Sequence, residues 1–167
     1  MQTLAFDGGM GASGDMILAA LLAAGADRAA LAPVEDALPV RYAVDGTTKN
    51  GIHATTVDVL LTDDVGDDVA AEHEHGHDEG AEHSHSHDHE HTRAEGHGHT
   101  RSYPEVVDLV DGLDLPGGVA ADAREAFRLL GGAEAAVHGT ALKETAFHEV
   151  GADDAIADVV GACLLLE

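Results

Sequence analysis

Positively charged residues are scarce in this sequence: 8 Lys and Arg stand against 32 Asp and Glu in 167 residues, a formal net charge of -24. A chain this acidic repels phosphates, so binding to nucleic acid or to anionic lipid is disfavoured. The single cysteine, Cys163, cannot form an internal disulfide, and no basic run precedes an apolar stretch at the N-terminus, so we expect a cytoplasmic protein. The longest apolar run, residues 16–26, is about half of the roughly 20 residues needed to cross a bilayer.

Histidine is concentrated in one segment. Between Asp63 and Arg101 lie ten of the 13 histidines, twelve acidic residues, two arginines and almost no large apolar side chain. Burial cannot offset the entropy cost of ordering such a segment, so we expect residues 63–101 to be a disordered His-, Asp- and Glu-rich insert. The rest of the chain still has 20 acidic against 6 basic residues. Because such a surface is tolerated where salt screens it, we hypothesise a salt-rich, halophilic-type cytoplasm.

The remaining sequence predicts one α+β domain, a small sheet with packed helices, interrupted by the insert. The dipeptides Asp45-Gly46 and Asn50-Gly51 supply turn residues beside segments rich in β-branched side chains, which predicts two antiparallel strands. Ser13 is placed to cap the first helix and Gly25 to end it, and Pro33 should kink the second helix or delay its start. The expected strands cover residues 2–7, 40–44 and 52–61, and the expected helices cover residues 16–24, 27–37, 104–112, 119–130, 133–138 and 153–166.

The glycine-rich turn after Asp7 is the first candidate site. A carboxylate at the end of a strand that faces a second carboxylate, Asp15, in a first helical turn can hold a hard cation or bind a phosphate through one. The candidate cofactor-binding residues are Asp7, Gly11, Ser13 and Asp15. The loop lacks the Lys-Ser/Thr ending of a P-loop, and a tight turn in which Asp15 only complements the helix dipole is the alternative. One functional hypothesis from this turn is a nucleotide-dependent hydrolase built on Asp7 and Asp15.

A second candidate site precedes the last predicted helix. His148 and Glu149 are adjacent on a turn, and Asp154 and Asp158 are one helical turn apart, so up to four ligand groups could reach a single point. Borderline divalent metals bind such a mixture of imidazole and carboxylate ligands. In the alternative interpretation, Asp153 or Asp154 caps the helix and His148 bonds to a backbone carbonyl.

The histidine-rich insert is the third candidate. Neutral imidazoles bind nickel, zinc and copper, and a flexible chain of them can collect ions without a fixed geometry, which suits capture or storage. A solvated linker without a role is one alternative, and a non-catalytic nickel metallochaperone or metal buffer that acts through the insert is another. The candidate ligands are His73, His75, His77, His83, His85, His87, His89, His91, His97 and His99.

Four motifs, in this order and around a His-rich insert, carry a family resemblance. They are residues 7–16, residues 99–103, residues 133–139, and Phe147-His148-Glu149-Val150-Gly151 followed by Asp154, Asp158 and Gly161. Over nearly its whole length, the chain resembles the N-terminal portion of the LarC family of nickel insertion proteins. The family usually has His-Phe-His-Glu where this chain has Ala146 first, and Cys-Phe-Ser where it has Gly8-Gly9-Met10, so a histidine and a sulfur ligand are missing.

The resemblance implies a nickel chelatase, a lyase that inserts nickel into a pyridinium bisthiocarboxylate mononucleotide in a CTP-dependent reaction and so matures lactate racemase-type enzymes. It implies that His148 and Glu149 are the catalytic, metal-handling residues, with Asp154 and Asp158 in support. It also implies that residues 1–167 supply the metal-binding part, while an absent C-terminal domain or companion chain handles CTP with a divalent metal. We expect this chain to be inactive without that part and to form a homo-oligomer.

Overall fold

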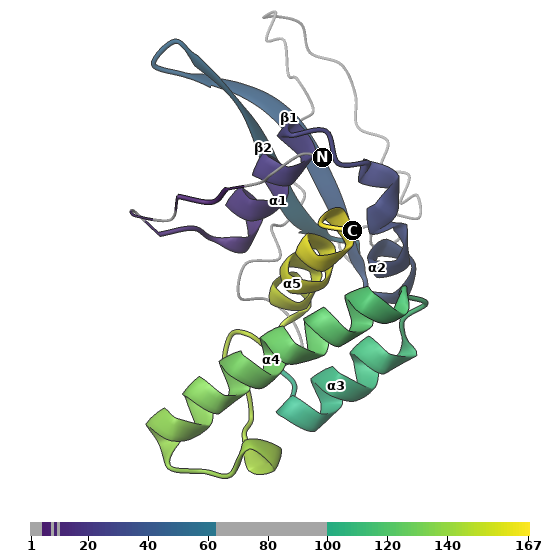
Figure 1. Ribbon diagram of the computed structural model, residues 1–167, viewed down its shortest axis with the longest axis vertical. Helices are drawn as coiled ribbons and strands as arrows, with labels where there is room; N and C mark the ends of the chain where they lie inside the picture. The colour runs from purple at the N-terminus through teal and green to yellow at the C-terminus, as the bar shows by residue number, and fades with distance from the viewer. Residues whose placement is uncertain (1–4, 8, 10, 63–99) are drawn as a thin grey trace, which may run out of the picture.

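The computed structural model describes residues 5–7, 9, 11–62 and 100–167 (Figure 1). These residues form a two-stranded antiparallel sheet with packed helices, which confirms the predicted α+β class. No helix in this part of the chain is long and apolar enough to span a membrane. The elements are α1 (Gly14–Ala23), the 3-10 helix η1 (Arg28–Leu31), α2 (Ala32–Ala37), β1 (Val40–Lys49), β2 (Ile52–Leu61), α3 (Tyr103–Gly112), α4 (Gly117–His138), the 3-10 helix η2 (Leu142–Glu144) and α5 (Asp153–Leu165).

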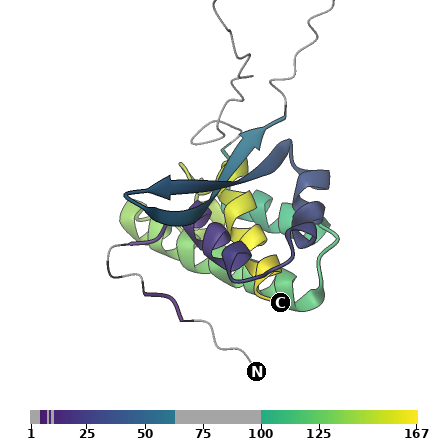
Figure 2. The ribbon, with the colours of Figure 1, turned by 90° about the horizontal axis from the view of Figure 1, so that it is seen from above.

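The sheet is a single long hairpin. Its two-residue loop, Asn50-Gly51, has positive φ values of 53° and 78°, as a type I′ turn requires, and this confirms the predicted turn. Asp45-Gly46 instead lies within β1 and pairs with Thr56 and Thr55 of β2. Towards the open end of the hairpin, alternate residues are buried, among them Tyr42 and its cross-strand partner Val59. One face of the hairpin therefore covers the helices, as Figure 2 shows.

Helix α5 lies at the centre of the fold, between the hairpin with α1 on one side and α4 with α3 on the other (Figure 1). Ile156, Ala157 and Val160 of this helix are fully buried. Gly161 allows β1 to approach closely, because an added Cβ would lie 2.8 Å from the Tyr42 hydroxyl. That hydroxyl donates a 2.6 Å hydrogen bond to the carbonyl of Ala157. The apolar character of the last helix thus reflects burial in this domain's own core.

The predicted helix end at Gly25 and the predicted late helix start at Pro33 are confirmed. Gly25 has a φ of 106° and ends α1 in a Schellman motif, in which the Ala26 amide bonds to Leu21 and the Gly25 amide bonds to Leu22. Pro33 lies in the first turn of α2, directly after the 3-10 helix η1, so the predicted helix over residues 27–37 is divided in two.

Three expectations about the elements are wrong or fall outside the described residues. Residues 5–7 are not in a strand, and residues 2–4 are not described. The helices predicted over residues 119–130 and 133–138 are one continuous helix, α4, because Gly131 is a close packing position: an added Cβ would lie 2.8 Å from Leu142 and 3.2 Å from Phe147. The predicted insert lies outside the described residues except for its last two, and Arg101 belongs to the fold.

Candidate metal centre

The last turn of α4 presents two ligand-type side chains on one face. Glu134 and His138 are four residues apart, a spacing that places side chains one above the other on a helix. Gly139, with a φ of 67°, ends the helix directly after His138. The helix therefore holds a carboxylate and an imidazole close together at its C-terminal end.

The segment before α5 is held in place by a short antiparallel pairing with residues 101–103. The Tyr103 amide donates to Thr145 and the Phe147 amide donates to Arg101, both at 3.0 Å. The Phe147 ring is 1% exposed and meets the rings of Tyr103 and Phe127 with centroid separations of 6.3 Å. Because Phe147 points into the core, the next residue, His148, points out of it towards α4.

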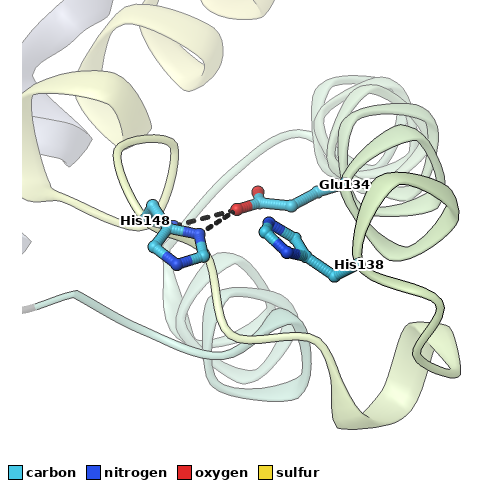
Figure 3. Close-up of side chains that lie close together, drawn as sticks. All are labelled: Glu134, His138 and His148. Atoms are coloured by element: carbon cyan, nitrogen blue, oxygen red, sulfur yellow. Dashed lines mark hydrogen bonds and ion pairs between the residues drawn. The ribbon is translucent and has the colours of Figure 1, made fainter.

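His148, Glu134 and His138 meet at the surface (Figure 3). Glu134 Oε1 lies 2.6 Å from His148 Nδ1 and accepts a 3.2 Å hydrogen bond from the His148 amide. The two imidazole rings have centroids 4.9 Å apart. Each of the three residues has one ligand atom within 4.8 Å of the others, and among the described residues this is the one group of three or more such side chains with that property.

The chemistry of this cluster suits a borderline divalent metal. Two imidazole nitrogens and one carboxylate oxygen form the donor set that nickel, zinc and cobalt accept. A carboxylate can only accept, so in the metal-free protein the proton between the two groups lies on His148 Nδ1, and an ion held jointly by Glu134 and His148 would take the place of that proton. The His148 side chain is 71% exposed and that of Glu134 is 16% exposed. The cluster is therefore an open site that exchanging ligands can reach.

A second group of predicted residues lies elsewhere, at the N-termini of α1 and α5. A pocket of about 180 Å³ is lined by Ser13 and the carboxylates of Asp15, Asp58, Asp154 and Asp158. Asp158 lies directly against α1, because a Cβ added to Gly14 would be 2.2 Å from its Oδ2. Glu149 lines an adjoining pocket with Asp154 and Asp158. These carboxylates make the region repulsive to anions and attractive to cations.

The opening loop brings together only part of the first candidate site. Asp7 accepts a 3.2 Å hydrogen bond from the Gly9 amide, which is a local turn, and it does not line the acidic pocket. The Ser13 hydroxyl donates a hydrogen bond to the Asp15 carboxylate in the first turn of α1. Gly11 has a φ of 87°, a conformation that favours glycine.

The four residues predicted to share one metal site are divided between two places. His148 joins α4, whereas Glu149, Asp154 and Asp158 line the acidic pockets. In the alternative interpretation, His148 was expected to bond to a backbone carbonyl, but its ring bonds to the Glu134 carboxylate. The ten histidines of the insert lie outside the described residues.

Sequence reasoning did not identify Glu134 and His138 as candidate ligands. The signal was present, since a Glu and a His four residues apart on a predicted helix share a face. The helical spacing could not show that His148 joins them, because a turn, η2 and an extended segment separate His148 from His138.

Comparison with known proteins agrees with a metal-handling role. A family model described as nickel insertion protein matches residues 4–167. A relative from Methanococcoides burtonii, provisionally named a nickel insertion protein, is 37% identical over 98% of this chain and 33% of its own length. A pyridinium-3,5-bisthiocarboxylic acid mononucleotide nickel insertion protein from Akkermansia muciniphila is 36% identical over 100% of this chain and 36% of its own length. The chain thus spans about a third of the length of these curated relatives. No solved structure matches the chain.

Proposed function

The chain belongs to the nickel insertion protein family, and from this premise we propose that it holds the nickel ion that a nickel chelatase inserts into a pyridinium bisthiocarboxylate mononucleotide. The supporting observation is the cluster of Glu134, His138 and His148, whose ligand atoms lie within 4.8 Å of one another. Nickel is the cargo of this reaction, so the site must release it as well as bind it.

The donor set suits release to a sulfur ligand. Nickel is a borderline metal and accepts nitrogen, oxygen and sulfur ligands, so a thiocarboxylate sulfur can replace imidazole or carboxylate donors one at a time. Three protein donors leave coordination positions open to the incoming group. Two neutral imidazoles and one carboxylate leave a bound Ni²⁺ with one net positive charge, which attracts the anionic thiocarboxylate groups within a strongly acidic protein.

The other parts of the proposal concern the larger enzyme. A C-terminal companion domain or chain would handle CTP with a divalent metal, and the curated relatives, of which this chain covers 33% and 36%, leave room for such a part. The product serves a lactate racemase-type apoenzyme, and the protein acts in the cytoplasm as a homo-oligomer. Glu149, Asp154 and Asp158 support the metal-handling segment. Asp7, Gly11, Ser13 and Asp15 are the proposed cofactor-binding residues; Ser13 and Asp15 line the acidic pocket, where a cation would have to offset the repulsion between the carboxylates and a phosphate.

The histidine-rich segment gives a second candidate function, a nickel metallochaperone or buffer. Thr100, the first described residue after that segment, precedes Arg101, and the Arg101 carbonyl is bonded to Phe147, next to His148. The chain therefore returns from the segment beside the cluster. This connection favours a segment that supplies the cluster with ions over one that acts independently of it.

The metal-binding experiment starts from the 167-residue chain with the ten histidines of the insert replaced by asparagine. Nickel affinity is measured by competition with a chromogenic chelator. One tight ion should remain, and Glu134→Gln, His138→Asn or His148→Asn should each weaken it about tenfold or more, a loss of about 1.4 kcal/mol. His53→Asn is the matched control, because His53 bonds to Thr48 on the hairpin.

Loss of all tight binding in the asparagine-substituted chain would favour the buffer. The insertion activity is tested with the chain, its companion part, nickel, CTP and the thiocarboxylate precursor, with the product detected by mass spectrometry. Absence of nickelated product from intact, metal-loaded proteins would contradict the proposed activity.

A further inference from the structure

Arg101 joins three points of the segment that leads from the core to α5. Its carbonyl accepts the 3.0 Å hydrogen bond of the Phe147 amide. Its guanidinium Nη1 lies 3.3 Å from the carbonyl oxygen of Gly151 and 2.7 Å from Oδ1 of Asp153, the first residue of α5. The one residue thus contacts the beginning, the middle and the end of residues 147–153, the segment that contains His148.

We propose that Arg101 is the positioning residue of the nickel site: by holding residues 147–153 against the pairing strand and α5, it presents His148 to Glu134 and His138 without touching the metal. The proposal rests on the proposed function of that cluster. It assigns a metal-dependent role to a residue that lies outside the ligand set.

The close approach of the two backbones is specific to this place. A Cβ added to Gly151 would lie 2.7 Å from both the backbone nitrogen and the backbone oxygen of Arg101. Gly151 therefore leaves room for Arg101 to lie directly against the segment. This backbone approach would be kept by any residue at position 101, so the contacts that require arginine are those of its guanidinium with Gly151 and Asp153.

The Arg101–Asp153 pair is also the most buried of the arginine–carboxylate pairs found among the described residues. The two side chains are 21% and 7% exposed, whereas those of Arg28 and Glu35 are 46% and 19% exposed, and those of Arg124 and Asp111 are 42% and 48% exposed. A buried pair is weakly screened by water and salt, and removing one partner leaves an uncompensated buried charge. The geometry of the segment is therefore held firmly as long as Arg101 is present.

His148 depends on that backbone because little else fixes it. Its side chain is 71% exposed, so packing does not hold the ring in place. The one side chain hydrogen-bonded to it among the described residues is Glu134, which also accepts from the His148 amide. If the backbone moves, both bonds to Glu134 weaken together, and the imidazole must be ordered at the cost of binding energy.

The test measures nickel affinity in the 167-residue chain with the ten histidines of the insert (residues 63–101) replaced by asparagine. Arg101→Gln should weaken nickel binding by about 10- to 100-fold, the range for lost outer-shell support. The visible absorption bands of the bound Ni²⁺ should keep their positions, because the ligands are unchanged. Arg101→Lys, which retains the charge but not the planar fork, should restore part of the affinity.

Arg28→Gln is the matched control for general destabilisation. Arg28, in η1, is also a bridging arginine: it is bonded to Glu35 of α2 at 2.8 Å and to the carbonyl of Tyr42 in β1 at 2.9 Å. Neither contact involves the nickel cluster. Its loss should lower the melting temperature and leave nickel affinity unchanged. If Arg101→Gln does not fold, the comparison of Arg101→Lys with Arg28→Lys carries the same expectation.

Two results overturn the positioning role: undiminished nickel affinity in the folded Arg101 variants, or an equal loss in the Arg28 control. The proposed function fails separately, if His148→Asn binds nickel as tightly as the parent. A loss in His148→Asn without a loss in the Arg101 variants leaves the nickel site and removes only the role of Arg101.

Discussion

Glu134 Oε1 is bonded to both the ring Nδ1 and the backbone amide of His148, at 2.6 and 3.2 Å. This double contact joins the end of α4 to the segment that leads into α5, fourteen residues further along the chain. It brings together one carboxylate and two imidazoles that come from two different segments of the chain.

Nickel should stabilise the fold when the ten segment histidines are asparagine. At a free nickel concentration of about 100 times the dissociation constant, the free energy of unfolding should rise by about 2.7 kcal/mol, since the metal binds the folded state. Urea unfolding with and without nickel measures this. The gain should disappear in His148→Asn and persist in His53→Asn; an equal gain in both variants would place the ion elsewhere.

Adjacent glycines in α4 should respond oppositely to alanine. Gly132 has open space where a Cβ would lie, so Gly132→Ala should stabilise the protein by about 1 kcal/mol through helix propensity. At Gly131 an added Cβ would lie 2.8 Å from Leu142, and overpacking of about 1–3 kcal/mol should outweigh the same gain. Chemical unfolding compares the two variants. Equal stabilisation of both would show that α4 is not packed closely at Gly131.

Tyr42 should make the fold sensitive to alkali. Burial above all, with the negative charges of Asp158 and Glu35, raises the pKa of Tyr42 well above its ordinary value of 10.0. The folded state therefore retains the phenol proton where the unfolded chain releases it, so this stability is complete below pH 10 and falls as the pH rises further.

The Tyr42→Phe variant separates this effect from the hydrogen bond. Loss of the bond to Ala157 should cost about 0.5–1.5 kcal/mol at neutral pH. Above pH 10, however, the free energy of unfolding of the variant should fall less steeply than that of the parent. Unfolding curves measured across the alkaline range decide it; parallel pH profiles would mean that Tyr42 does not control the loss.

Salt should stabilise the unmodified protein. Asp15, Asp58, Asp154 and Asp158 line one pocket, and the whole chain carries a formal charge of -24, so repulsion between carboxylates is strongest in dilute buffer. The melting temperature should rise in molar NaCl, and equally in molar KCl, because screening depends on ionic strength rather than on the cation. A melting temperature as high in dilute buffer would contradict the hypothesis of a salt-rich cytoplasm.

Features that depend on a few neighbouring residues were decided by the sequence alone. Asn50-Gly51 adopts positive φ values at low cost, so the hairpin turn was predictable, and Gly25 and Pro33 ended or broke helices for equally local reasons. The resemblance to nickel insertion proteins was also visible in the order of motifs, and the match over residues 4–167 confirms it.

Only the tertiary structure decided how α4 and the metal centre are built. The sequence predicts two helices over residues 119–130 and 133–138, but Gly131 lies inside one continuous helix, where Leu142, Tyr103 and Phe147 from other segments pack against it. The scarcity of large apolar residues predicts an insert that extends to Arg101, yet the ion pair with Asp153 makes Arg101 part of the fold. His148 meets Glu134 because the buried Phe147 ring and the pairing with Arg101 direct it there. Contacts between segments distant in sequence leave no periodic signal in the chain, so they become visible only when the core is packed.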